Sequence, residues 1–164
     1  MAFKREHVEK WLATQFPGER LVSMVATGVW STSYTGAQLD APKADRLLEL
    51  RRSLGLNDEL RVGAGYATTF YALTESQIIL GTRSDFLNRP KDLLYAAPID
   101  GFMLHWFDDT DGPNRSRYFI TEFGDGKWRS DRIGLTALGN PIKGSTANEF
   151  IQALGSHATQ VLNP

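Results

Sequence analysis

The stretch that most constrains the fold of this chain is residues 66–84, YATTFYALTESQIILGTRS. Side chains over residues 69–74 alternate between two sides, which is the period of a β-strand. Glu75-Ser76 interrupts this strand, and the run Gln77-Ile78-Ile79-Leu80 follows, with β-branched residues that favour a second strand. Two strands separated by two residues predict a β-hairpin. We therefore expect the rest of the chain to be built around this hairpin.

Length and charge limit the architecture and the partners. A chain of 164 residues, of which 41% are hydrophobic, can bury one sizeable core, so we expect a single domain over residues 1–164. Its 18 lysines and arginines nearly balance 19 aspartates and glutamates. This balance removes the broad positive field on which non-specific binding to nucleic acid depends, and we expect no nucleic-acid partner.

The chain has no cysteine, which excludes disulfides, thiolate metal sites and a cysteine nucleophile. This composition is typical of a reducing compartment. The first twenty residues mix charges with scattered apolar positions and lack the apolar core of a signal peptide. No run approaches the roughly 18 apolar residues of a membrane span. These features predict a cytoplasmic location.

An amphipathic helix is expected in residues 1–17, where Phe3, Val8, Trp11, Leu12 and Phe16 share one face. That face can pack on a protein core or lie on a lipid surface. The first twenty residues carry four basic and three acidic side chains, a net charge of 4 − 3 = +1. Such a charge attracts anionic lipid only weakly, so packing is favoured over membrane anchoring.

The segment between this helix and the hairpin contains a predicted strand and a predicted helix. Residues 19–30 suit a first strand, and the small polar residues 31–41 are typical of a loop. Pro42 can open a helix that continues over residues 43–54, before Gly55. We therefore predict a helical insertion within residues 31–62.

Gly63-Ala64-Gly65 resembles the start of a dinucleotide-binding loop. Such a loop opens a helix and has a third glycine, whereas here a predicted strand follows and Thr68 takes that position. We interpret Gly63 and Gly65 as residues that allow either a bend with unusual backbone dihedrals or a close approach of two backbones.

The second half predicts more strands and a final helix. Residues 83–91 are expected to form a loop, and strands are expected over residues 93–97, 99–107, 118–123 and 127–130. Residues 133–144 are expected to be irregular. Thr146 and Glu149 have the spacing of a capping box for a helix over residues 145–155. The tail after His157 is expected to fray.

No motif points to catalysis or to a metal. None of the histidines, His7, His105 and His157, has a partner at a spacing known from metal sites. Asp109 and Asp111 resemble part of a calcium-binding loop. Counted from Asp109, the twelfth position is Ile120, whereas a calcium-binding loop needs a glutamate there as a ligand. GxSxG, GxxxxGK and HExxH motifs are absent. The sequence predicts no cofactor and no enzymatic activity.

Aromatic residues lie on consecutive predicted strands and suit either a base-stacking platform or a core. Near-zero net charge and the absence of a ribonucleoprotein motif favour the core. The residues are Phe102, Trp106, Phe107, Tyr118, Phe119 and Trp128.

Four motifs follow one another along the chain: Gly18-Glu19-Arg20-Leu21-Val22, the YALTESQIIL hairpin, Phe123-Gly124-Asp125-Gly126 and Ala147-Asn148-Glu149-Phe150-Ile151. In this order they resemble the bacterial pleckstrin-homology-like domains. The resemblance covers roughly residues 18–30 and 66–155. The resemblance implies an α+β, mainly β fold of bent antiparallel sheets, a partly open barrel capped by a C-terminal helix. The N-terminal helix and the inserted helix depart from the simplest pattern. The resemblance also implies a bacterial binding or assembly scaffold.

Three hypotheses of function follow. The first is a non-enzymatic binding or protein-protein interaction module that can self-associate. The second is a peripheral membrane or anionic-ligand binding domain that uses a basic patch of Arg46, Arg51, Arg52, Arg83, Arg89 and Lys91. A solvated helix face explains the arginines of residues 46–52 more simply. The third is an unrecognised hydrolase, which would need a concave pocket with titratable residues of shifted pKa.

Eukaryotic relatives of this family that bind phosphoinositides use a basic cluster across the first two strands. Only Arg20 and Arg61 lie near those positions in this chain. Recognition of lipid headgroups in that manner is therefore not expected.

Overall fold

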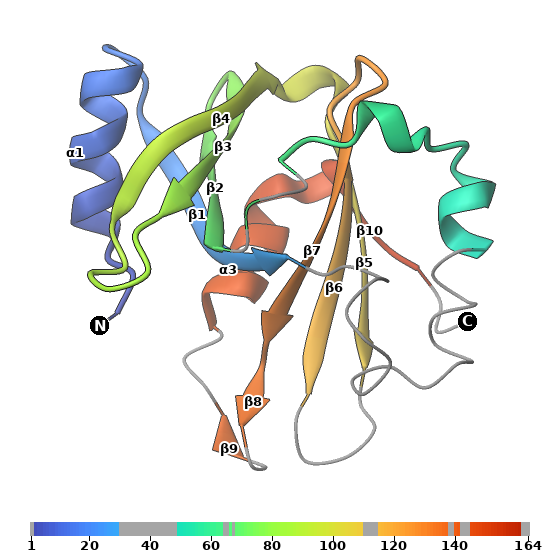
Figure 1. Cartoon of the computed structure of the whole chain (residues 1–164). Coiled ribbons are helices and arrows are strands. Elements are labelled where there is room, and N and C mark those ends of the chain that lie inside the picture. The colour runs from blue at the N-terminus through green and yellow to red at the C-terminus, as the bar shows by residue number, and fades with distance from the viewer. Residues whose placement is uncertain are drawn as a thin grey trace.

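The computed structural model describes residues 2–29, 49–63, 66, 68–109, 115–137, 140–141 and 145–161. Its elements (Figure 1) are α1 (Arg5–Gln15), β1 (Leu21–Val29), the 3-10 helix η1 (Asp58–Leu60), β2 (Thr68–Thr74), β3 (Gln77–Arg83), β4 (Pro90–Pro98), η2 (Ile99–Gly101), β5 (Met103–Asp109), β6 (Ser116–Glu122), β7 (Trp128–Gly134), β8 (Thr136–Ala137), β9 (Asn140–Pro141), α3 (Ser145–Leu154), η3 (Gly155–His157) and β10 (Ala158–Gln160).

Eight strands form one open sheet in the order β10-β5-β6-β7-β1-β2-β3-β4, and β8 pairs with β9. Neighbouring strands in the large sheet are antiparallel, except that β10 runs parallel to β5. The fold is therefore α+β and mainly β, as predicted. Strands β1 to β4 form one half of the sheet and strands β5 to β7 the other. The two halves meet where β1 pairs with β7.

The predicted hairpin is confirmed, with Glu75-Ser76 between β2 and β3. The hydroxyl of Thr74 accepts hydrogen bonds from the backbone N–H groups of Ser76, at 3.3 Å, and of Gln77, at 2.9 Å. These bonds stabilise the turn. Both faces of the hairpin are buried, because one faces the main core and the other faces α1. This explains why apolar residues occupy both alternating sets of positions.

The apolar face of α1 packs on the sheet, as predicted. Val8 and Leu12 are buried in one cluster with Met24 and Phe70. The Trp11 indole meets the Phe70 ring edge-on, with ring centroids 5.2 Å apart. In the described part of the chain, no helix is long and apolar enough to cross a membrane.

Helix α3 packs against the other face of the sheet, where Ala147, Phe150 and Leu154 are buried in the main core (Figure 1). The capping-box prediction is wrong in detail. The helix begins at Ser145, so Thr146 lies in its first turn and does not precede it. The aromatic-core prediction is confirmed for Phe102, Phe107, Tyr118, Phe119 and Trp128, which are buried, whereas Trp106 is partly buried against the same core.

The prediction of a frayed tail after His157 is wrong. Ala158 pairs with Leu104 of β5 in parallel register, so β10 adds a strand to the sheet. The Nδ1 atom of His157 lies 2.9 Å from the backbone oxygen of Phe102. Backbone pairing thus orders a segment whose side chains give no local signal.

Several predicted boundaries also shift. Arg83 and Pro90 are paired strand residues, so the loop predicted over residues 83–91 is shortened to residues 84–89. Residues 99–101 form η2 before β5, and residues 133–134 belong to β7. Pairing with neighbouring strands extends β3, β4 and β7 beyond their strongly β-forming residues.

The described part of the predicted insertion is helical, with residues 49–53 in a helix and η1 after it. The backbone of Gly63 has φ +62°, which confirms the predicted bend at that glycine. Residues 30–48, with Pro42 and Arg46, lie outside the described residues, as do Gly65 and residues 110–114.

The packing of α1 predicts a measurable loss of stability. Leu12→Ala removes a buried side chain and leaves a cavity, so the free energy of unfolding should fall by about 2–5 kcal/mol. Urea denaturation followed by circular dichroism measures the change. Lys10→Ala, on the exposed face of the same helix, is the control and should change stability by no more than about 0.5 kcal/mol. Equal stability of both variants would contradict the packing of α1.

Candidate functional site

In the described part of the chain, the two halves of the sheet share a short seam. Strand β1 pairs with β2 from Leu21 to Gly28, and its described residues pair with β7 at Gly28 and Val29. From this seam toward Met24, β1 and β7 diverge and leave a groove of about 780 Å³. We call it the β1 groove; its described lining residues are Ala2, Phe3, Met24, Val25, Ala26, Thr27, Gly28, Arg83, Asn88, Arg132, Ile133, Gly134 and Thr146.

The lining shows that the groove follows the edge of β1. Successive residues of a strand point to opposite faces of a sheet. All five residues from Met24 to Gly28 line the groove, so it wraps around the edge of the strand. Among the described residues, no strand pairs with residues 23–27 on the side opposite β2. An open strand edge offers backbone N–H and C=O groups to another chain.

Two arginines give the β1 groove a positive charge. Arg83 donates from Nε to the carbonyl oxygen of Thr69 at 2.6 Å and from Nη2 to that of Thr27 at 2.8 Å. Arg132 donates from Nε to the hydroxyl of Ser116 at 2.9 Å. Burial lowers the pKa of Arg83, and the nearby charge of Asp85 partly opposes this. The described lining of the groove includes no carboxylate.

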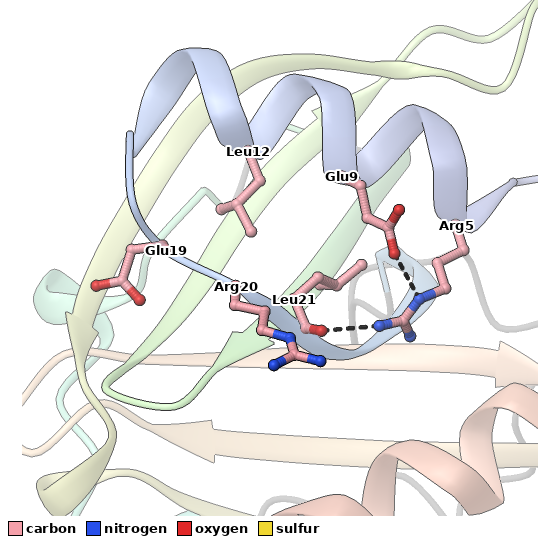
Figure 2. Close-up of a pocket in the computed structure, with 6 residues that line it drawn as sticks. All are labelled: Arg5, Glu9, Leu12, Glu19, Arg20 and Leu21. Atoms are coloured by element: carbon pink, nitrogen blue, oxygen red, sulfur yellow. Dashed lines mark hydrogen bonds and ion pairs between the residues drawn. The ribbon is translucent and has the colours of Figure 1, made fainter.

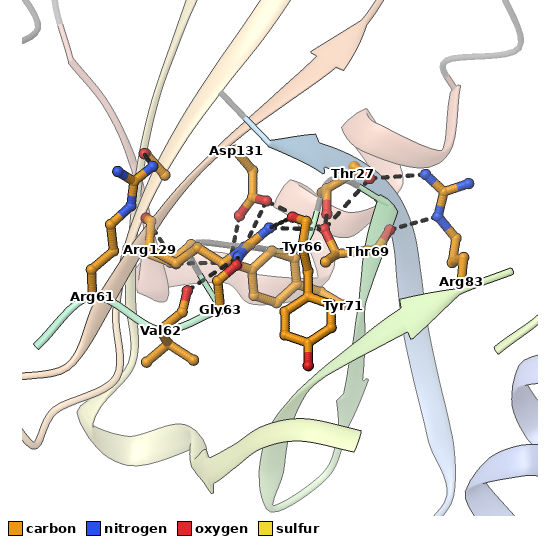
Figure 3. Close-up of polar contacts among 12 residues, drawn as sticks. Thr27, Arg61, Val62, Gly63, Tyr66, Thr69, Tyr71, Arg83, Arg129 and Asp131 are labelled. Carbon is orange, nitrogen blue, oxygen red and sulfur yellow. Dashed lines mark hydrogen bonds and ion pairs between the residues drawn. The ribbon is translucent and has the colours of Figure 1, made fainter. Parts of the chain in front are cut away.

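A buried polar network, which we call the junction network, lies next to the seam (Figure 3). Its centre is the ion pair between Arg129 Nε and Asp131 Oδ1, 2.9 Å apart, with both side chains at most 1% exposed. The remaining donors of Arg129 reach the carbonyl oxygens of Val62, Gly63 and Tyr66 and the hydroxyl of Thr69. Five bonds use the five donors of the guanidinium.

The carboxylate of Asp131 is bonded from two directions. The Tyr71 hydroxyl donates to Asp131 Oδ2 at 2.7 Å and lies 2.9 Å from the hydroxyl of Thr121. Thr27 and Thr69 join their hydroxyls at 2.7 Å, so β1 belongs to the same network. These contacts link β1, β2, β6 and β7 with the segment that contains Val62.

The pKa shifts in the junction network are those of a structural site. Burial raises the pKa of Tyr71 well above its usual value, and the charge of Asp131 raises it further. Burial alone would lower the pKa of Arg129, but the charge of Asp131, the hydrogen bond to it and the nearby Tyr71 act together in the other direction, and the pKa is raised. Tyr71 therefore stays a hydrogen-bond donor and Arg129 stays charged, so neither is suited to proton transfer near neutral pH.

Gly63 fits its place in this network for a steric reason. A side chain there would bring Cβ to 2.8 Å from Nη1 of Arg129, in addition to the strain at φ +62°. The glycine therefore allows the backbone to approach the buried guanidinium.

A second pocket, of about 400 Å³, lies between α1 and the start of β1 (Figure 2). Arg5 pairs with Glu9 at 2.7 Å and donates to the carbonyl oxygen of Leu21 at 2.7 Å. Hydrogen bonds from Ser76, Thr74 and Gln77 lower the pKa of Glu19. Two arginines and two glutamates line this pocket, so its charges balance and it favours no class of ion.

The basic residues predicted as one patch lie in two places. Arg51 pairs with Asp58 and stacks on the Trp128 ring, with its guanidinium carbon 4.7 Å from the ring centroid. Arg52 is exposed on the same helical segment. Arg83, Arg89 and Lys91 belong to the β3–β4 hairpin, which lies on the opposite side of the molecule from residues 49–53 in Figure 1. Arg46 lies outside the described residues.

The end of the β3–β4 hairpin carries exposed apolar side chains that the sequence prediction missed. Phe86 is 93% exposed and Leu87 is 46% exposed. Arg89 and Lys91 follow them and are also exposed. The available signal was an apolar pair, Phe86-Leu87, inside an otherwise polar loop.

The β1 groove was also missed. Its only local signal was the pair of small residues Ala26 and Gly28 in the predicted first strand. Their size leaves room beside the strand, but the groove exists only because β7 leaves β1 after the seam.

The histidines are placed without a metal site. His105 Nε2 lies 2.8 Å from Glu122 Oε2, and His157 bonds the backbone of Phe102. The described part of the chain contains no group of three or more metal-ligating side chains.

Comparisons of this chain with protein-family models, with curated proteins and with solved structures found no match.

The junction network predicts an asymmetric mutational effect. Arg129→Met leaves Asp131 buried without its cation, and the free energy of unfolding should fall by about 3–5 kcal/mol. The double variant Arg129→Met/Asp131→Leu removes both charges and should be more stable than Arg129→Met alone. Urea denaturation of the parent and the three variants, with Asp131→Leu included, measures the coupling. Additive losses would show that the two charges do not depend on each other.

Proposed function

We propose that this protein is a non-enzymatic binding module that holds a protein segment in the β1 groove. The observation that carries this proposal is the edge of β1 over residues 24–27, which pairs with no strand opposite β2 among the described residues and lines a concave, partly apolar surface. Such edges bind proteins by adding a strand to the sheet. The groups in the junction network with shifted pKa values are bonded to one another inside the fold, which supports a structural role for them.

The proposal includes a pleckstrin-homology-like architecture. Two features support it. The described strands fall into two antiparallel sets, β1 to β4 and β5 to β7, which meet where Gly28 and Val29 of β1 pair with β7. Helix α3 inserts Ala147, Phe150 and Leu154 into the core, the role of the last helix in that family. The binding scaffold that the resemblance implied agrees with the presence of the β1 groove.

Closing the β1 groove tests the proposal. Thr146 is exposed on the first turn of α3 and lines the groove, so Thr146→Trp should obstruct it. We expect the parent chain to retain a protein partner in affinity capture, or to self-associate in light scattering, and Thr146→Trp to lose that binding. Gln152→Trp, exposed further along the same helix, is the matched control and should bind as the parent does. A parent chain that is monomeric and retains no partner would contradict the proposal.

A second function, peripheral binding to an anionic membrane surface, is favoured by the β3–β4 hairpin. Phe86 and Leu87 can enter the lipid interface while Arg89 and Lys91 stay near anionic headgroups. Asp85 and Asp92, exposed in the same hairpin, reduce this attraction.

Liposome flotation separates this second function from the first. The chain should float with phosphatidylcholine vesicles that contain phosphatidylserine and not with phosphatidylcholine alone. Phe86→Ser should abolish flotation because it removes the most exposed apolar side chain. Leu60→Ser, which changes an exposed leucine on η1, is the control and should leave flotation unchanged. Equal recovery with both vesicle types would exclude charge-dependent membrane binding.

A further inference from the structure

We infer that the β1 groove binds an extended, acidic peptide segment that adds to the sheet as a strand beside β1. This inference rests on the proposed binding function and specifies the chemistry of the partner.

The backbone of a bound peptide would pair with β1 next to the seam. Strand β7 occupies the place beside β1 at Gly28 and Val29, and its pairing with β1 ends there. Toward Met24, the same place along β1 is the groove. Five residues of a strand extend over about 17 Å, enough to pair with a peptide of similar length. A bound peptide would continue the sheet where β7 leaves it.

The shape of the groove limits the side chains that a peptide can place in it. Different clusters of apolar side chains form the two walls of the groove. Phe3 and Met24 form the wall on the side of α1, and Val25 and Ile133, which belong to the main core, form the other. A peptide strand places alternate side chains on opposite faces of the sheet. We therefore expect apolar residues at alternate positions of the peptide, in contact with these walls.

The charge of the groove decides the class of peptide. Arg132 is bonded to a serine hydroxyl, and Arg83 to carbonyl oxygens and to the side chain of Asn88. Hydrogen bonds to neutral groups satisfy donors without cancelling the positive charge. Asp85 acts on Arg83, but it bonds Thr68 and is not among the described lining residues of the groove. Carboxylates on the peptide would supply the missing charge and form strong bonds with arginine.

A displayed library of random dodecapeptides, panned against the full chain, provides the probe. We expect enrichment of peptides with alternating apolar residues and at least one aspartate or glutamate. Arg132→Glu should weaken the selected peptide by about tenfold or more and shift selection toward basic peptides. Arg52→Glu, an exposed arginine on the helical segment of residues 49–53, is the control and should leave the affinity unchanged.

Backbone pairing is tested on the peptide, so that a failure of the protein to fold cannot confuse the result. N-methylation at alternate positions removes N–H donors from one edge of a strand at a time. One set of methylated positions should abolish binding and the other should preserve it. Amide hydrogen exchange of residues 23–28 should slow when the unmodified peptide binds.

Several outcomes would overturn the inference. They are no enrichment, enrichment of basic peptides by the parent chain, or equal binding of both N-methylated forms. If Thr146→Trp loses a captured protein while the library yields no peptide, the binding function stands and strand addition by an acidic peptide fails. A parent dimer that Thr146→Trp converts to monomer would identify a second copy as the occupant and also overturn the inference.

Discussion

The buried ion pair between Arg129 and Asp131 is the interaction on which the rest of the structure depends. Among the described residues, the two halves of the sheet share two residue pairs between β1 and β7, and the backbone hydrogen bonds of these two pairs join them weakly. The junction network adds contacts from β1, β2, β6 and β7 at the same place. An ion pair in such surroundings requires nearly complete hydrogen bonding, because each unpaired charge would be costly. That requirement defines how the two halves can meet.

The short seam and the β1 groove have the same origin. Where β1 and β7 diverge, α3 completes the core. The ring centroids of Phe150 on α3 and of Tyr71 lie 6.1 Å apart. Had β7 followed β1 along its full length, no groove would lie there. Helix α3 packs against β1 where β7 no longer pairs with it, and the groove beside them is the surface on which we base the proposed function.

Open strand edges also invite unwanted pairing, and this chain limits them. Arg5 covers the carbonyl oxygens of Leu21 and Val22 at the start of β1, where the register shifts between Leu21 and Ser23. Strand β10 covers the edge of β5. Residues 24–28 line the groove together with two arginines, which would repel a cationic chain. This stretch of β1 is therefore short and selective in charge.

The sequence by itself determined the elements whose signals are local: the β2–β3 hairpin, the apolar face of α1 and the final helix. Each follows from the spacing of side chains along one segment, which reports the period of a strand or a helix. Only the tertiary structure decided the pairing of Gly28 with Arg132, the parallel strand β10 and the separation of Arg51 from Arg83. These depend on contacts between segments far apart in the chain, and their side chains carry no period that reveals a distant partner. The β1 groove belongs to this second class, because a groove is the space between elements and no single segment encodes it.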